Sequence, residues 1–219
     1  MEVFMKKWFI LLFVCGLLFA FGCSDDDDDI TNGNDTPVKY IIPMAVGNQW
    51  TGIDTMFNSN GSYNSHVLHQ YRLIKDTSVL SSTWYKMEIS RIPTTDTALD
   101  LYQSGTDGSA WLLYDYASSP ASGTLWLKHP ATVDEQYMTG STDEDSVTVT
   151  HIDTSITVPD STFTCYRYKI VSYDNGDRLE NYYYMAPDAG FVKWEKYITP
   201  SGQSQYLQYR WMLNDLLLY

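Results

Sequence analysis

The histidines are the side chains of this sequence with the broadest chemistry, because a neutral imidazole can bind a metal ion and can transfer a proton near neutral pH. The chain has 4 of them. His66 and His69 lie three residues apart in a run typical of a strand, so their side chains should point to opposite faces and cannot share a metal ion. His129 and His151 stand alone in the sequence. We therefore expect no metal site and no cofactor.

Carboxylates are the second group that could do chemistry, in a paired-carboxylate hydrolase or a calcium site. Acidic clusters occur at residues 143–145 and 174–177. Neither has the spacing of a calcium loop, and their composition is typical of a solvated loop and a hairpin turn. A hydrolase with dispersed carboxylates, such as Asp100, Asp115 and Glu180, is the least favoured hypothesis, because two carboxyl groups would have to converge in a cleft.

Motifs of the common catalytic classes are absent. The chain has no Gly-x-Ser-x-Gly, Ser-x-x-Lys or His-Glu-x-x-His sequence and no glycine-rich phosphate loop. Cys165 lies in a strand-like run without a nearby histidine, so we expect a small buried core residue and not a nucleophile. The sequence therefore predicts a protein that is not an enzyme.

Aromatic residues are the remaining signal for binding. They make up 15% of the chain, with 18 Tyr and 7 Trp. Exposed on one face of a sheet, they would stack on sugar rings or line an apolar groove; buried, they would form the core of an aromatic-rich β-fold. The candidate ligand-binding residues are Trp111, Tyr114, Trp126, Tyr184 and Trp194.

The elements that would position these residues are strands. From residue 40 onward, runs rich in Tyr, Trp, Val, Ile and Thr alternate with turn clusters, and no segment keeps apolar residues at helical spacing for three turns. The run 111–116 is apolar on both faces, which predicts a strand buried on two sides. Strands are expected at about 49–57, 66–75, 83–91, 98–103, 110–116, 125–128, 147–152, 166–173, 178–185, 191–198 and 205–213.

Three turns should join neighbouring strands into hairpins. Asn175-Gly176 tolerates the positive φ angles of a type I′ turn, and residues 105–108 and 200–202 have similar turn composition. Sequential hairpins pair each strand with its chain neighbours, and a sheet of many strands must twist and curl. The predicted fold is an all-β antiparallel meander that forms a curved sheet or half-open barrel, with a β-sandwich as the alternative.

The charge balance argues against a nucleic-acid partner. The formal net charge is −13, and the 14 basic residues are scattered along the sequence. A protein that neutralises phosphates needs clustered Lys and Arg. We expect no nucleic-acid partner and, on the same ground, no polyanion partner.

The N-terminus is typical of a secretion signal. Lys6 and Lys7 precede an apolar stretch that ends at Cys23, and the stretch is shorter than the about 20 residues of a spanning helix. Residues 18–23, Leu-Phe-Ala-Phe-Gly-Cys, resemble a lipobox, although Ala20 stands where Leu is usual. We expect a membrane anchor of acyl chains, such as palmitate, on Cys23. Cleavage after Gly22 with plain secretion is the alternative.

Acidic residues separate this anchor from the predicted strands. Five aspartates at 25–29 follow Ser24, and the polar composition that continues to Pro37 cannot form a core. Ser-Asp-Asp-Asp-Asp after the cysteine also resembles an export signal to the outer face of the outer membrane in some Gram-negative lineages. The expected location is therefore the outer membrane, facing outside, with the periplasmic face as the alternative. The expected organisation is a signal peptide at 1–22, an acidic disordered tether at 23–38 and one β-domain at 39–219.

Three stretches together resemble one family of secreted bacterial proteins. They are Tyr-Ile-Ile-Pro-Met-Ala-Val-Gly-Asn-Gln-Trp at 40–50, Val-Pro-Asp-Ser-Thr-Phe-Thr-Cys-Tyr at 158–166 and Tyr-Tyr-Met-Ala-Pro-Asp-Ala-Gly-Phe-Val-Lys-Trp-Glu at 183–195. In these motifs the chain resembles the TapB-like group of uncharacterised lipoproteins, although Ser161 stands where that pattern has Gly. The resemblance implies a curved antiparallel sheet or half-barrel and no established enzyme activity.

The functional hypothesis from the sequence is a non-enzymatic, lipid-anchored β-domain of the cell envelope. Its aromatic surface would bind a small apolar ligand, a glycan or another envelope protein. The alternative is a structural or adhesion protein without a pocket.

Overall fold

The computed structural model describes residues 37–79, 81–92, 97–113, 123–139 and 146–219. Residues Val38–Tyr219 form one compact unit. Cys23, Tyr114, Asp115 and the cluster at 143–145 lie outside the described residues, as do the predicted signal peptide and nearly all of the predicted tether.

The described residues form strands joined by turns and loops, and none of their segments is a helix that could span a bilayer. The strands are β1 (Gln49–Phe57), β2 (Tyr63–Val79), β3 (Ser82–Ile92), β4 (Thr97–Ser104), β5 (Ala110–Leu113), β6 (Thr124–Leu127), β7 (Gln136–Met138), β8 (Ser146–Val158), β9 (Ser161–Asp174), β10 (Asp177–Ala186), β11 (Gly190–Thr199) and β12 (Tyr206–Leu217).

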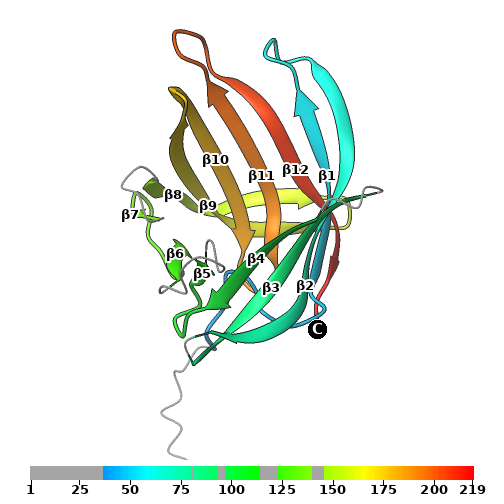
Figure 1. The fold of residues 1–219 in the computed structure, drawn as a ribbon, viewed down its shortest axis with the longest axis vertical. Helices are drawn as coiled ribbons and strands as arrows, with labels where there is room; N and C mark the ends of the chain where they lie inside the picture. The colour runs from blue at the N-terminus through cyan, green and yellow to red at the C-terminus, as the bar shows by residue number, and fades with distance from the viewer. Residues whose placement is uncertain (1–36, 80, 93–96, 114–122, 140–145) are drawn as a thin grey trace, which may run out of the picture. The chain divides into compact units, whose positions relative to one another are not determined.

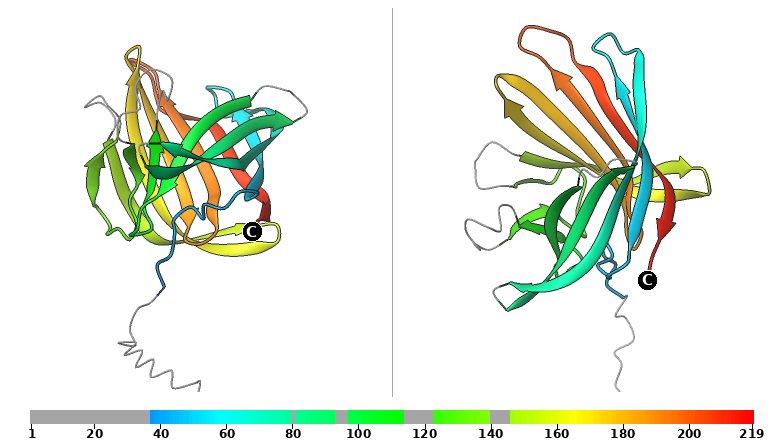
Figure 2. Two further views of the ribbon diagram at one scale, coloured as in Figure 1. Left: turned by 60° about the horizontal axis from the view of Figure 1, so that its bottom comes forward. Right: turned by 45° about the vertical axis from the view of Figure 1, so that its right-hand side comes forward.

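The strands form one antiparallel sheet with the order β6-β5-β4-β3-β2-β1-β12-β11-β10-β9-β8-β7 (Figure 1). Most strands pair with their neighbours in the chain, and the first and last strands, β1 and β12, pair in the middle of the sheet. The sheet is strongly curved, as the two further views show (Figure 2). The predicted all-β meander and half-open barrel are therefore confirmed, and the alternative β-sandwich is not observed.

The predicted turns are confirmed. Asn175 and Gly176 have φ angles of 50° and 88°, as a type I′ turn requires. The turn before β5 has a hydrogen bond from the N–H of Gly108 to the carbonyl of Gly105, and the turn before β12 has one from Gln203 to Pro200. The sequence prediction missed β7, and it ended β2, β8 and β12 several residues too early.

The main core lies on the concave face of the sheet. Trp126 of β6 contacts Phe191 of β11, with ring centroids 6.0 Å apart, and Tyr71 of β2 stacks on the same ring at 5.1 Å. Only the concave side of a curved sheet can bring together rings from strands that are not neighbours. Ile41 and Ile42, which precede β1, are fully buried in this core.

Strand β5 is buried on both faces, as its sequence predicts. Ala110 and Leu112 belong to the main core. Leu113 belongs to a second, smaller cluster, against which Trp111 packs. The other members of that cluster are Val79, Trp84 and Leu101.

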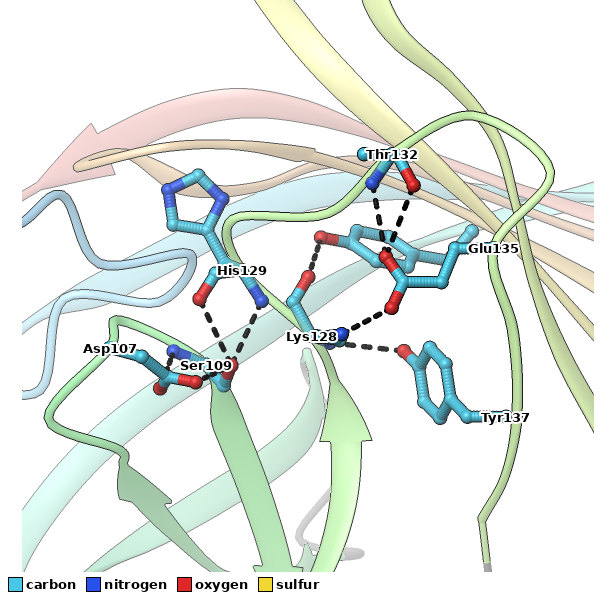
Figure 3. A network of polar contacts seen from close by, with 8 residues as sticks. Asp107, Ser109, Lys128, His129, Thr132, Glu135 and Tyr137 are labelled. Atoms are coloured by element: carbon cyan, nitrogen blue, oxygen red, sulfur yellow. Dashed lines mark hydrogen bonds and ion pairs between the residues drawn. The ribbon is translucent and has the colours of Figure 1, made fainter.

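Side chains connect the two edge strands of the sheet, β6 and β7 (Figure 3). The hydroxyl of Tyr137 accepts a hydrogen bond from the backbone N–H of Lys128 at 3.0 Å and donates one to the carbonyl of Trp126 at 3.1 Å. Tyr168 donates to the carbonyl of Lys128 at 2.7 Å, and Lys128 also forms an ion pair with Glu135. We call these contacts the seam.

The loop that follows β6 is held at its other side by Ser109 (Figure 3). The hydroxyl of Ser109 accepts a hydrogen bond from the backbone N–H of His129 at 2.9 Å. The same hydroxyl donates a hydrogen bond to Oδ2 of Asp107 at 2.9 Å. These contacts fix the loop that carries half of the seam.

Candidate functional site

Four aromatic side chains form a continuous row on the concave face. Trp126 meets Tyr183 edge to face at 5.3 Å. The ring of Tyr183 is parallel to that of Trp194 at 6.0 Å, and Trp194 is parallel to Tyr209 at 6.5 Å. Trp126 is buried, whereas the other three are half-buried. This aromatic row therefore offers accessible ring surface that is continuous with the core.

Strand register places the row. Tyr183 of β10 is the direct cross-strand partner of Trp194 on β11, and Tyr209 of β12 is the partner of Lys196, two residues further along β11. Residues two apart in a strand share a face. The indole N–H of Trp194 donates to Oδ1 of Asn181 at 3.2 Å, which orients the ring before any ligand binds.

Buried polar groups lie beside the aromatic row, and we call them the polar floor: Asp54, His69 and Trp211. Asp54 of β1 and Trp211 of β12 are cross-strand partners, and Trp211 is also the partner of Trp194. Asp54 is only 2% exposed. Nδ1 of His69 lies 3.3 Å from Oδ2 of Asp54. The floor therefore joins the row through Trp211.

Several atoms of the polar floor are unsatisfied. Among the described residues, Oδ1 of Asp54 and Nε1 of Trp211 have no hydrogen-bond partner, and Nδ1 of His69 has only its contact with Asp54. A buried polar group without a partner costs about 1–3 kcal/mol. Such groups occur in native proteins chiefly where a ligand or water satisfies them. The floor therefore places buried polar groups that need a hydrogen-bond partner beside the accessible rings of the aromatic row.

Tyr71 connects the polar floor to the hydrophobic core. Its ring stacks on His69 at 5.2 Å and meets Trp211 edge to face at 5.4 Å. Burial raises the pKa of Tyr71 far above its usual value, and nearby Tyr183 and Asp54 raise it further. The Tyr71 hydroxyl therefore stays protonated at any physiological pH.

The predicted binding residues divide between the two faces of the sheet. Trp126 and Trp194 both belong to the aromatic row. Tyr184 points to the opposite, convex face, where its hydroxyl donates to Oε2 of Glu195 at 3.2 Å. Trp111 packs against the second cluster, and Tyr114 lies outside the described residues.

The sequence prediction omitted several members of the site. Tyr183 and Tyr209 have the same residue type as many strand tyrosines of this chain, so only the register separates them from the rest. Asp54 and His69 gave a weak signal, as a carboxylate and an imidazole in neighbouring predicted strands. Their proximity depends on the pairing of β1 with β2.

His66 and His69 point to opposite faces of β2, as the sequence predicts. His66 is exposed and contacts the hydroxyl of Tyr63 at 2.6 Å, whereas His69 is buried on the concave face. His129 is buried against Tyr166, and burial lowers the pKa of its imidazole. Within the described ranges, no group of three or more His, Cys, Asp or Glu side chains could hold a metal ion.

The dispersed carboxylates do not converge in the described part of the chain. Asp100 of β4 faces the concave side as the partner of Met87, and burial raises the pKa of its carboxyl group. Glu180 of β10 faces the convex side, where Tyr182, Lys169 and Arg178 contact it. Two carboxylates on opposite faces of a sheet cannot act on one bond.

A separate hollow of about 490 Å³ lies between the segment before β1 and the strands β3 and β4. Tyr40, Met44, Tyr85 and Tyr219 are among its lining residues. No charged side chain and none of the unsatisfied buried atoms contributes to this lining. The concave face is therefore the stronger candidate for a binding site.

Comparison with known proteins supports the fold. No protein-family model matches the chain, and no curated protein matches it in sequence. One similar solved structure is a protein of Bacteroides fragilis described as exported and as having a YmcC-like fold. Its sequence identity is 12%, its TM-score is 0.51, and the match covers 82% of this chain and 100% of that chain.

A second similar structure is a protein of Parabacteroides distasonis described as a lipoprotein. The identity is 13% and the TM-score is 0.50, and the match covers 83% of this chain and 100% of that chain. At these identities the likeness shows a shared fold. The chain is thus an all-β protein with the fold of two bacterial structures, one described as an exported protein and the other as a lipoprotein.

Proposed function

We propose that the protein is a non-enzymatic, lipid-anchored domain of the bacterial cell envelope that binds a glycan on its concave face. The observation that carries the proposal is the continuity between accessible parallel rings and unsatisfied buried polar atoms. Sugar rings present apolar faces that stack on aromatic side chains and hydroxyl edges that need hydrogen-bond partners. A purely apolar ligand would leave Asp54 and Trp211 unsatisfied.

The anchor is part of the same proposal. Cys23 would receive the acyl chains, and two or three such chains give stable membrane residence. The aspartates at 25–29 would repel anionic headgroups and direct the chain to the outer face of the outer membrane. Support comes from the lipobox-like sequence and from structural neighbours described as exported or as a lipoprotein.

The anchor can be tested separately from the binding site. Intact-mass analysis of the protein purified from membranes should show cleavage before Cys23 and the added mass of acyl chains. Proteolysis of whole cells should degrade the protein if it faces outside. An unmodified N-terminal cysteine, or full protection until the outer membrane is opened, would overturn the corresponding claim.

The binding site can be tested with tryptophan fluorescence and native mass spectrometry. The mature chain with Cys23→Ser is titrated with neutral oligosaccharides, fatty acids and envelope extracts. Saturable binding of an oligosaccharide should weaken at least tenfold in Trp194→Ala and in Asp54→Asn. The control is Tyr173→Ala, because Tyr173 is 58% exposed and pairs with Arg178 on the face opposite to the row.

Two outcomes would count against the proposal. Oligosaccharide binding that is unchanged in Trp194→Ala and Asp54→Asn would place the site elsewhere. No saturable binding of any ligand by a folded protein would favour the alternative of a structural or adhesion protein.

A further inference from the structure

The convex face of strands β9 to β12 carries a cluster of cations and tyrosines, which we call the convex cluster. Cross-strand pairing aligns Arg167, Tyr184 and Lys193 in one line across the sheet. It aligns Lys169, Tyr182, Glu195 and Arg210 in the next. The members of the cluster are Arg167, Lys169, Arg178, Lys193, Arg210, Tyr182, Tyr184, Tyr197, Glu180 and Glu195.

Two glutamates inside the cluster are already neutralised. Oε1 of Glu195 lies 3.0 Å from both the Lys193 ammonium and Nε of Arg210. Burial disfavours the charged form of Glu195, yet these two cations hold the pKa of the carboxyl group below its usual value. Glu180 contacts Lys169 at 3.1 Å and Arg178 at 2.7 Å. Four of the five cations thus form ion pairs with two carboxylates.

Arg167 is the remaining cation. Among the described residues, no carboxylate lies within 4.0 Å of its guanidinium group. The group is nevertheless fixed in place, because Nε donates to Oγ1 of Thr150 at 2.7 Å and the guanidinium lies 5.2 Å from the centre of the Tyr182 ring. A fixed guanidinium with unused terminal N–H groups is suited to bidentate binding of a carboxylate.

A cleft of about 310 Å³ opens at this guanidinium. It is lined by Arg167, Tyr182, Tyr184, Glu195, Tyr197 and Gln205. The volume is at the small end of ligand sites and suits one sugar-sized group. Tyr197 meets Tyr182 edge to face at 5.6 Å. The cleft therefore combines aromatic surface, one amide, the Glu195 carboxylate that Lys193 and Arg210 neutralise, and the unpaired guanidinium of Arg167.

The charge of the whole chain narrows the class of anion. The cluster has five cations and two carboxylates, so it is positive, while the chain as a whole carries −13. A densely charged polyanion would be repelled by the rest of the surface. A single carboxylate next to a sugar ring meets the local positive charge without that penalty.

We infer that the convex cleft binds a carboxylate-bearing sugar, such as one uronic acid residue of an acidic glycan, through Arg167. This site is independent of the proposed concave site, because the two lie on opposite faces of the sheet. A single carboxylate is compatible with the expectation, drawn from the scattered basic residues, that no polyanion binds. The fold gathers five of them on one face.

The test is an NMR titration of the mature chain carrying Cys23→Ser. The probes are glucuronate, a trigalacturonate, glucose and inorganic phosphate. The two uronic acid probes should shift resonances of β9 to β11 residues on the convex face, and raising salt from 50 to 500 mM should weaken the binding several-fold. Glucose and phosphate should bind at least tenfold more weakly.

Matched variants identify the group responsible. Arg167→Gln should abolish the shifts, and Arg167→Lys should weaken binding at least threefold because the fork geometry is lost while the charge is kept. Lys75→Gln is the control, since Lys75 is an exposed cation on β2. If Arg167→Gln does not fold, Tyr197→Ala is the second variant that tests the cleft. It removes a lining ring and leaves the guanidinium in place.

Three results would overturn the inference. Equal binding of glucose and glucuronate would remove the role of the carboxylate. Equal binding of phosphate, or Arg167-dependent binding to anionic lipid vesicles, would show a general anion site. Unchanged uronate binding in Arg167→Gln would exclude this cleft. If Trp194→Ala loses oligosaccharide binding on the concave face but keeps uronate binding in the convex cleft, the two sites are distinct. The failure of one proposal can then be told from the failure of the other.

Discussion

The hydroxyl of Tyr137 accepts a hydrogen bond from the backbone N–H of Lys128 at 3.0 Å. The same hydroxyl donates a hydrogen bond to the carbonyl of Trp126 on the edge strand β6. It therefore satisfies backbone groups that a neighbouring strand would otherwise pair. An edge strand otherwise leaves such groups without a partner in the sheet. The half-open barrel is connected at this point by side chains and not by backbone pairing.

The first prediction concerns this seam. Tyr137→Phe removes both hydrogen bonds and leaves the ring, so the free energy of unfolding should fall by about 1–3 kcal/mol. Denaturant unfolding followed by tryptophan fluorescence measures the change. Tyr173→Phe, at an exposed position, should change stability by less than about 0.5 kcal/mol. Equal effects of the two variants would show that the seam does not stabilise the fold.

The second prediction concerns the pH dependence of stability at Glu195. Since its pKa is lowered in the folded state, ionised Glu195 stabilises the fold above the unfolded-state pKa near 4.5, and this contribution is lost as pH falls through the folded value. Glu195→Gln should lower the free energy of unfolding by about 1–3 kcal/mol at pH 7. The gap between wild type and variant should narrow as the pH is lowered.

Denaturant titrations at several pH values between 3 and 7 check this prediction. Asp153→Asn is the control, because Asp153 is exposed on β8. A gap that stays constant from pH 7 to pH 3 would mean that the loss in the variant comes from packing and not from the charge of Glu195.

The fold was predictable because its signals are local. Asn175-Gly176 specifies a type I′ turn within two residues, and its φ angles match that type. Strand β7 escaped prediction because Gln136–Met138 is three residues long and its pairing with β8 is not encoded in the segment itself. Local sequence signals therefore predicted the hairpins but not the short edge strand β7.

The two sites were less predictable because they depend on register. Asp54 and His69 approach each other only through the pairing of β1 with β2. Lys169 and Arg210 share the convex face only through the chain of pairs across β10 and β11. A shift of one residue in any of these strands would move its side chains to the other face.

The third prediction concerns the thiol of Cys165, which is fully buried. Burial raises the pKa of the thiol to about 12, so the reactive thiolate is scarce and inaccessible at neutral pH. In the mature chain with Cys23→Ser, Cys165 is the single thiol. A colorimetric thiol reagent should modify it at least a hundredfold more slowly in native buffer than in denaturant. Comparable rates would contradict its place in the core.

The last prediction concerns Gly190, which begins β11 and lies against the side chain of Trp50. Its φ angle is +85°, and a Cβ atom there would lie 2.8 Å from Nε1 of the fully buried Trp50. Gly190→Ala should therefore destabilise the protein by backbone strain and by displacement of Trp50, about 2–4 kcal/mol in all. Gly176→Ala is the matched control: its φ is +88° and nothing lies within 4 Å of the added methyl, so strain alone, about 1 kcal/mol, remains. Denaturant unfolding should separate the two variants, and equal losses of stability would show that Trp50 moves aside without an energetic penalty.

The same substitution should also affect binding, because Trp50 packs edge to face on Phe191 at 5.4 Å. A larger loss of stability in Gly190→Ala should come with weaker oligosaccharide binding, which Gly176→Ala should leave unchanged.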